Sequence, residues 1–224
     1  MKATVFGDSI LKGVLLENGR YSVNREWEEK LKEQFSLEVV NRSRFGCTIR
    51  KAIPAIRKDC KENPGSGEVV VLEFGGNDSD FPWAEISENP EGCYQCKTPP
   101  EVFRALYLEA VQDICRSGRK PVMITLPPIH SERYLRFICR NGLEAKHILQ
   151  WLGDVEAISR WQEHYSRMIR EMAEKLRIEL IDLRAAFPSA GADLADYLCE
   201  DGIHPSRRGQ ELIYRSFCHA LAPM

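Results

Sequence analysis

Five short apolar runs, separated by longer amphipathic stretches, constrain the fold of this chain more than any other feature. The runs lie at 3–6, 37–40, 69–74, 121–126 and 178–183. The segment Val69-Val70-Val71-Leu72 is continuously apolar rather than alternating, which is typical of a strand covered on both faces. Such strands alternating with helices predict a five-stranded parallel sheet between two helix layers, a three-layer α/β/α sandwich.

The stretches between these runs have the apolar spacing of helices. Candidate helices lie at 24–35, 48–61, 100–117, 156–176 and 206–221. In the fourth, Ile158, Trp161, Tyr165 and Met168 recur at intervals of three or four residues and share one helix face. We interpret this face as core packing rather than as a cofactor site. Because the chain has no internal repeat and no linker, we expect one domain over residues 1–224.

Two long stretches, at 78–99 and 127–155, do not fit the alternation of strands and helices. Excursions of this length in a compact domain are usually functional loops or lids, and we expect the second to be helical only in part. Both stretches contain aromatic residues, whose rings suit either stacking on the faces of a sugar or lining a groove for an acyl chain. These residues are Phe81, Trp83, Tyr94, Tyr134, Phe137 and Trp151.

The composition excludes several classes of partner. The chain has 224 residues, a formal net charge of −2 and 43% hydrophobic residues, which is ordinary for a soluble globular protein. A charge so close to neutral gives no bulk attraction for nucleic acid or an anionic membrane, so we expect neither partner. No apolar run approaches the roughly 18 residues of a spanning helix. The start of the chain lacks a signal-peptide pattern, and we therefore expect a cytoplasmic protein.

The eight cysteines are scattered along the chain, which indicates reduced thiols rather than a disulfide framework. The segment Cys93-Tyr94-Gln95-Cys96 is the only CxxC pair in the sequence. One such pair is half of a zinc site, and no second pair or nearby histidine completes it. We expect neither a metal nor a cofactor.

Polar or glycine-bearing turns follow four of the five predicted strands. Parallel strands direct their carboxyl ends to one edge of a sheet, and open α/β sheets bind their ligands there. We therefore expect all four turns to lie together at that edge. In chain order they are Gly7-Asp8-Ser9, residues 41–46 ending in Gly46, Gly75-Gly76-Asn77-Asp78, and Asp201-Gly202-Ile203-His204.

These turns contain the groups that nucleophilic catalysis by a serine requires. Ser9 would sit at a strand-to-helix turn, where an imidazole that accepts its proton makes the hydroxyl a nucleophile. His204 supplies the imidazole, and the spacing of three residues lets the carboxylate of Asp201 reach back and orient the ring. The Ser9 N–H, the Gly46 N–H and the side-chain amide of Asn77 together describe an oxyanion hole.

The four turns resemble the four sequence blocks of the SGNH (GDSL-type) hydrolase family, in that family's order and over nearly the whole chain. Ile10 stands where the longest form of the first block has leucine, at a packing position. The resemblance implies a flavodoxin-like fold with a five-stranded sheet. It also implies Ser9 as the nucleophile, His204 as the base, Asp201 as the residue that orients it, and the oxyanion hole described above.

We therefore predict a serine hydrolase that cleaves a small-molecule carboxylic ester through an acyl-enzyme. The resemblance covers enzymes that deacetylate carbohydrates as well as lipases and thioesterases, so these substrates all stay open, with a preference for a small ester. The residues expected to line the substrate site are Asp8, Asp78, Phe81, Trp83, His130 and Tyr134.

Two other classes of function compete with hydrolysis. A flavodoxin-like sheet with polar turns at its edge could bind a nucleotide or phosphate without catalysis. Against this, no GxxxxGK[ST] or GxGxxG motif is present, and Asp201 and His204 would have no role. The 127–155 excursion could instead bind another protein or a second copy of the chain, which would give a homo-oligomer.

Overall fold

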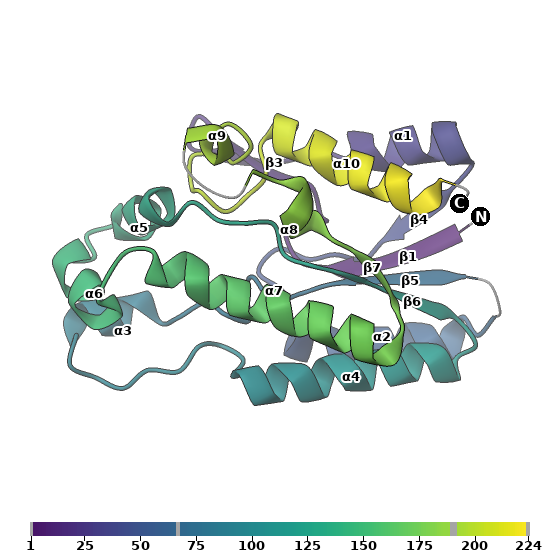
Figure 1. Ribbon diagram of the computed structural model, residues 1–224, viewed down its shortest axis with the longest axis horizontal. Helices are drawn as coiled ribbons and strands as arrows, with labels where there is room; N and C mark the ends of the chain where they lie inside the picture. Colours follow the sequence, from purple (N-terminus) through teal and green to yellow (C-terminus); the bar gives the residue numbers. More distant parts are fainter. Residues whose placement is uncertain (1, 66–67, 189–191, 223–224) are drawn as a thin grey trace.

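A five-stranded sheet forms the centre of the protein (Figure 1). The computed structural model describes residues 2–65, 68–188 and 192–222. The strand order is β4-β1-β5-β6-β7, and each pair of neighbours is parallel. The strands are β1 (Lys2–Gly7), β4 (Glu38–Asn41), β5 (Val69–Glu73), β6 (Lys120–Ile124) and β7 (Glu179–Ile181). Each overlaps one predicted run, so the prediction of the sheet is confirmed.

Helices cover both faces of the sheet and give three layers (Figure 1). One face carries α2 (Ile49–Glu62), α4 (Pro100–Arg116) and α7 (Ala157–Leu176), and the other carries α1 (Glu26–Phe35) and α10 (Arg207–Leu221). Successive side chains of a strand point to opposite faces. In β5, Val70 and Leu72 therefore belong to the core of the first face, whereas Val71 belongs to the core of the second. This double burial explains the continuously apolar run.

A β-hairpin that the sequence analysis did not predict follows the turn at Ser9. It consists of β2 (Val14–Glu17) and β3 (Arg20–Val23), which pair antiparallel. Asn18 and Gly19 form its turn with φ angles of 52° and 69°. The Asn-Gly dipeptide favours this left-handed backbone and was the signal available in the sequence. The expectation that Ser9 lies at a strand-to-helix turn is wrong, because the hairpin intervenes before α1.

The two excursions form a helical layer beyond the carboxyl ends of the strands (Figure 1). The first contains α3 (Trp83–Glu88), and the second contains α5 (Ser131–Cys139) and α6 (Ala145–Leu152). The second excursion is thus helical in part, as predicted. These helices and the start of α7 enclose an apolar cluster of their own, separate from the two cores on the sheet. Its buried members are Trp83, Ile86, Leu135, Ile148 and Ile158.

Two short helices, α8 (Leu183–Ala186) and α9 (Ala192–Ala195), follow β7 and lead to the Asp201–His204 turn. α10 begins three residues after His204, with Ser206 as its N-cap, whose hydroxyl accepts from Gly209 N. Among the described residues, none of the helices combines the length and the apolar character that crossing a bilayer requires.

Candidate active site

Ser9 lies just after β1, where the backbone turns sharply. Val14 N donates to Ser9 O at 3.0 Å, which closes the turn. A side chain at Gly7 would be crowded, because a Cβ would lie 3.0 Å from Glu73 Oε2 and 3.1 Å from Glu73 O. The Gly-Asp-Ser motif therefore lets β1 approach β5 closely and present Ser9 at the edge of the sheet.

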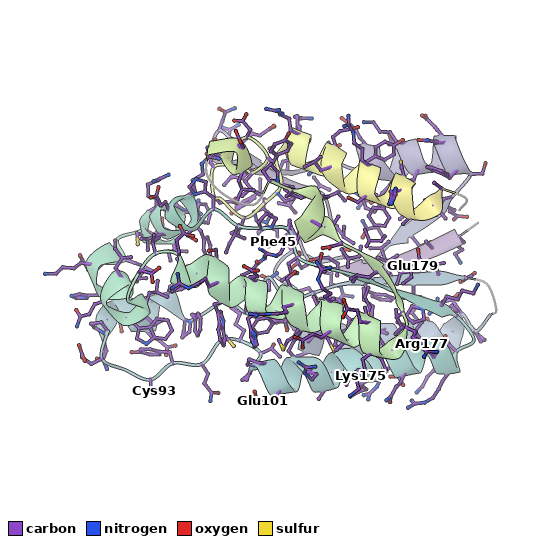
Figure 2. The ribbon with its side chains drawn as sticks, viewed as in Figure 1. Phe45, Cys93, Glu101, Lys175, Arg177 and Glu179 are labelled. Atoms are coloured by element: carbon purple, nitrogen blue, oxygen red, sulfur yellow. The ribbon has the colours of Figure 1, made fainter. Side chains whose placement is uncertain are left out.

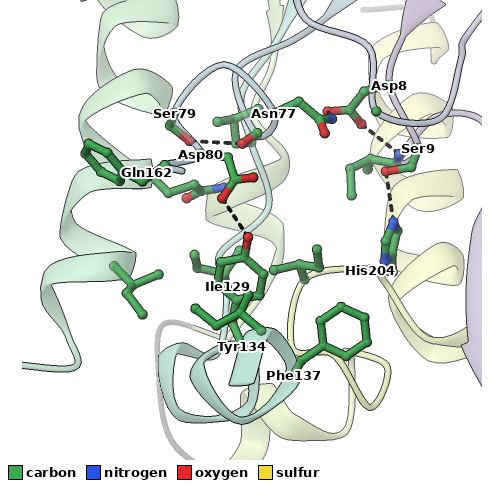
Figure 3. Close-up of a pocket in the computed structure, with 18 of the residues that line it drawn as sticks. Asp8, Ser9, Asn77, Ser79, Asp80, Ile129, Tyr134, Phe137, Gln162 and His204 are labelled. Carbon is green, nitrogen blue, oxygen red and sulfur yellow. Dashed lines mark hydrogen bonds between the residues drawn. The ribbon is translucent and has the colours of Figure 1, made fainter. Parts of the chain in front are cut away.

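Ser9, His204 and Asp201 form one chain of hydrogen bonds. His204 Nε2 lies 2.9 Å from Ser9 Oγ (Figure 3), and His204 Nδ1 lies 2.6 Å from Asp201 Oδ2. The three residues are buried, and even Ser9 is only 7% exposed. The tertiary structure thus brings the hydroxyl of Ser9 to the imidazole of His204, 195 positions away in the sequence, and to its neighbour Asp201, in a place with little access for water.

Asp201 is held as a carboxylate that faces the imidazole ring. Its Oδ1 accepts from Ile203 N (3.1 Å) and His204 N (3.0 Å), which leaves Oδ2 for the ring. Burial raises the pKa of Asp201, but the hydrogen bonds from the His204 ring and from these backbone groups outweigh burial and bring the pKa below its ordinary value. An ionised Asp201 favours the tautomer with the proton on Nδ1, so that Nε2 of His204 can accept a proton from Ser9.

Gly202 joins the turn of His204 to the second excursion. Its φ is +74°, and a Cβ there would lie 2.7 Å from His130 O and 2.7 Å from Arg133 Cβ. His130 N also donates to Gly202 O at 2.8 Å. The glycine between Asp201 and His204 is therefore required by close packing against the start of α5.

Gly46 and Asn77 line the same pocket as Ser9. Gly46 has a φ of +65°, a left-handed conformation that favours glycine. Asn77 Nδ2 donates to Asp8 Oδ2 at 2.9 Å, while Asp8 Oδ1 accepts from Ile10 N at 2.8 Å. The carboxylate of Asp8 therefore orients both the amide of Asn77 and the backbone that follows Ser9.

Two buried carboxyl groups, of Asp8 and Glu73, lie beneath this turn. Glu73 Oε2 accepts from Asp8 N at 3.2 Å. Burial raises the pKa of Glu73 well above its ordinary value, and the negative charge of Asp8 adds to the effect. Burial also raises the pKa of Asp8, although the hydrogen bonds from Ile10 and Asn77 oppose it. The pKa of Glu73 is thus raised more than that of Asp8, which makes Glu73 the weaker acid of the pair.

A cavity of about 300 Å³ opens beside Ser9 (Figure 3). Tyr21 of the hairpin and Phe45 of the loop after β4 flank its entrance, with ring centroids 5.8 Å from that of His204. The sequence analysis did not select either ring. Phe45 directly precedes Gly46 in the second turn, whereas Tyr21 lies in the hairpin that was not predicted. Other lining residues that it did not select as site residues are Ser79, Asp80, Leu126, Pro127, Ile129, Phe137, Ile138, Leu152, Ile158, Trp161 and Gln162.

Residues 5–212 match the model of the GDSL-like lipase/acylhydrolase family. The chain belongs to this family. It is therefore a hydrolase of ester bonds, and the family resemblance found in the sequence is confirmed. Among the curated proteins, none gives a significant match.

Solved structures share the fold of this GDSL-like hydrolase. A lipase/acylhydrolase from Enterococcus faecalis is 18% identical, with a TM-score of 0.67 over 98% of this chain and 94% of that one. An acetylxylan esterase from Geobacillus stearothermophilus is 17% identical, with a TM-score of 0.66 over 100% and 94%. An alpha/beta hydrolase enzyme from the metagenome of Lake Arreo, Spain, is 20% identical, with a TM-score of 0.67 over 98% and 94%.

Two expected substrate-lining residues of the GDSL-like hydrolase, Asp78 and His130, are not among the described residues that line the cavity. Asp78 is fully buried, and its carboxylate oxygens lie 3.1 and 3.2 Å from Ile49 N, the first residue of α2. Burial raises the pKa of Asp78 to about 7, although the hydrogen bond from Ile49 opposes this. Asp78 thus fixes a helix, and His130 contacts Gly202 through its backbone. The other expected residues, Asp8, Phe81, Trp83 and Tyr134, line the cavity.

The cysteines of the GDSL-like hydrolase are all free. Cys93 lies exposed on the first excursion (Figure 2), whereas Cys96 is buried with its Sγ 3.0 Å from Tyr165 Oη. Within the part of the chain that the structure describes, no group of three or more His, Cys, Asp or Glu residues is arranged to hold a metal ion. The CxxC pair therefore contributes one surface thiol and one thiol packed against α7.

Proposed function

We propose that this GDSL-like hydrolase cleaves carboxylic esters with Ser9 as the nucleophile, His204 as general base and acid, and Asp201 as the residue that orients His204. The hydrogen-bond chain of 2.9 Å and 2.6 Å through His204 carries the proposal. These separations lie within the range in which a side chain takes a proton from its neighbour.

The reaction proceeds through an acyl-enzyme. Ser9 Oγ attacks the carbonyl carbon of the ester while its proton passes to His204 Nε2. The bond from carbon to the alcohol oxygen then breaks, and His204 returns the proton to that oxygen. A water molecule then gives a proton to His204 and attacks the acyl carbon. The bond from carbon to Ser9 Oγ breaks, His204 returns the proton to Oγ, and the carboxylic acid leaves. Asp201 stabilises the imidazolium that forms twice in this cycle.

The negative charge on the carbonyl oxygen needs donors that are in place before the reaction begins. Ser9 N–H, Gly46 N–H and the Asn77 amide are our candidates, and the common position of these residues on one cavity wall supports them. The hydrogen bond from Asn77 to Asp8 keeps the amide from rotating freely. In a cavity that excludes water, such fixed donors stabilise a developing charge more strongly than water does.

The test compares the wild type with Ser9→Ala on p-nitrophenyl butyrate. Ser159→Ala is the matched control, because Ser159 lies on α7 and its hydroxyl bonds only to Glu156 among the described residues. We expect Ser9→Ala to lose at least about 1000-fold in kcat and Ser159→Ala to keep wild-type turnover. Equal activity of Ser9→Ala and the wild type would refute the proposal.

The same Ser–His–Asp arrangement would also cleave thioesters, and the similarity to an acetylxylan esterase makes acetylated sugars a second candidate substrate. Matched pairs of an ester and a thioester with one acyl group, together with acetylated xylan, separate these possibilities in one set of assays. A higher kcat/KM for the thioester would assign a thioesterase, and release of acetate from xylan would assign a carbohydrate esterase.

A further inference from the structure

We infer that the cavity beside Ser9 binds an apolar acyl chain of medium length, from about butyryl to octanoyl, between the two excursions and α7. The inference rests on the proposed ester hydrolysis. It names the group that becomes attached to Ser9, which the mechanism above leaves open.

The position of His204 decides which side of the cavity takes which half of the ester. His204 has to reach the alcohol oxygen in order to protonate it, so the alcohol lies on the side of the imidazole. That side is the entrance, where Tyr21 and Phe45 flank the ring. The acyl group therefore extends away from His204, past Asn77 into the rest of the cavity.

The part of the cavity remote from His204 is bounded by the excursions and by α7. In Figure 3, Ser9 and His204 lie on one side of the cavity, whereas Asp80 and Gln162 lie on the opposite side. Ile158 also lines the cavity and precedes Gln162 by four residues on α7, so both project from the same helix face. The deep wall opposite the nucleophile is thus partly built by Ile158.

The polar groups of this deep part have protein partners already. The carboxylate of Asp80 accepts from Trp83 Nε1, Tyr134 Oη and Lys97 Nζ, each at 2.7 Å. Both ends of the Gln162 amide are also bonded: its Nε2 donates to Pro127 O, and its Oε1 accepts from the guanidinium of Arg184. A substrate with hydroxyl groups would find few free partners here and would lose its bonds to water, whereas an apolar chain has none to lose.

The aromatic rings around the deep part of the cavity pack against one another. Phe81 packs edge-on against Trp151 and Trp83, with ring centroids 4.9 and 5.7 Å apart, and Trp83 packs edge-on against Tyr134 at 6.3 Å. Trp83 is only 8% exposed. A sugar needs a free ring face, and in this deep part the rings pack against one another; the exposed rings of Tyr21 and Phe45 lie at the entrance, on the side of the alcohol. Between the two uses left open by the sequence, the arrangement favours an acyl-chain groove.

The volume sets the length of the chain. The cavity of about 300 Å³ lies at the lower end of the range of roughly 300–1,000 Å³ that is usual for small-molecule sites. Part of this space belongs to the ester group and the alcohol, which leaves room for a medium chain rather than for a long fatty acyl group.

The first experiment measures kcat/KM for esters of one alcohol with acyl chains from acetate to dodecanoate. We expect kcat/KM to rise about fourfold for each added methylene, the equivalent of about 0.8 kcal/mol, and to level off at or before octanoate. A preference for acetate, with activity that still depends on Ser9, would overturn the acyl-chain inference and leave the proposed hydrolase intact. Activity that does not depend on Ser9 would overturn the proposed function instead.

Substitutions of Ile158 test directly whether the deep wall limits the length of the acyl chain. Ile158→Phe fills the cavity, so the ratio of kcat/KM for octanoate to that for acetate should fall at least about tenfold. Ile158→Ala deepens the cavity, and the optimum should move to a longer chain. Leu176→Phe is the matched control, because Leu176 is exposed at the far end of the same helix. An unchanged chain-length profile in both Ile158 variants would contradict the inference.

Binding measured without turnover makes the test independent of the assay substrate. Calorimetry on the Ser9→Ala protein with the free acids from butanoate to octanoate should give an affinity that rises with chain length. Adding Ile158→Phe should abolish this rise. An affinity that does not depend on chain length would overturn the inference, whichever esters the wild type cleaves.

Discussion

Asp8 Oδ2 accepts a hydrogen bond from Asn77 Nδ2 at 2.9 Å, which joins the turn after β1 to the turn after β5. The two residues are 69 positions apart in the chain. A side-chain amide has two N–H groups, so Asn77 keeps a second donor after the first is bonded to Asp8. The sequence analysis expected Asp8 to line the substrate site. The contact adds that Asp8 orients the amide of Asn77, which we propose as a donor to the oxyanion.

Asn77→Ala should lower kcat by about 100- to 1000-fold, since it removes one donor to the oxyanion. KM should change little, because the donor acts mainly on the transition state. Steady-state kinetics on the preferred ester measure both constants. Near-wild-type turnover of the variant would remove Asn77 from the oxyanion hole.

Asp8→Ala should lower kcat by roughly tenfold or more, because the amide of Asn77 loses its anchor. If Asp8 acts through Asn77, the double variant Asp8→Ala/Asn77→Ala will lose less activity than the product of the two single losses. A double-mutant cycle on kcat, with circular dichroism to verify folding, measures this coupling. Losses that simply multiply would mean that Asp8 acts independently of Asn77.

Asp201→Asn should lower kcat by about 1000- to 10,000-fold, since an amide no longer favours the tautomer with a free Nε2 on His204. The pKa of Asp201 lies below its ordinary value. Its ionised form therefore stabilises the folded protein at neutral pH, and this stabilisation is lost as the pH falls through the lowered pKa. Turnover of wild type and variant between about pH 6 and pH 9 measures the effect. A large loss of turnover at every pH in this range supports the assignment, and a ratio near one refutes it.

Asp78 should make the protein less stable as the pH rises from about 4 to about 7. Its pKa in the folded protein is about 7, against an ordinary value of 3.8. Over this range the folded state holds a proton that the unfolded state has released, so the free energy of unfolding falls with rising pH, by at most about 4 kcal/mol. Asp78→Asn keeps an acceptor for Ile49 N and does not titrate. Urea unfolding should show a shallower dependence on pH in the variant, and an identical slope would contradict this account.

Asp59→Ala should lower the free energy of unfolding by about 3–5 kcal/mol. Arg119 is fully buried, and its Nη2 lies 2.7 Å from Asp59 Oδ2, so the variant leaves a buried guanidinium without its closest carboxylate. Asp154→Ala is a suitable control, because Asp154 and Arg160 form an exposed pair, whose removal should change the free energy of unfolding much less. Equal losses of stability in the two variants would contradict the role given to Arg119.

Local signals in the sequence located most of the sheet and its main helices. The runs that became β1 and β5, and the apolar spacing that became α7, depend on residues only a few positions apart. The hairpin after Ser9 was also signalled locally, by Asn18-Gly19. It was not predicted, because a helix was expected directly after the turn at Ser9. The helices of the excursions were harder to predict, because they pack into a separate cluster away from the sheet.

The sequence by itself determined the sheet, the order of the four turns and the family of this hydrolase, because each of these depends on short motifs and on the periodicity of neighbouring residues. Only the tertiary structure decided what surrounds the motifs. Ser9 and His204 are 195 positions apart, and Asp8 and Glu73 are 65 apart. Whether Asp78 faces a substrate or the start of a helix depends on such distant contacts, as does the cavity between the excursions and α7. Burial and close packing between distant segments are set when the whole chain folds, so no local pattern could have revealed them.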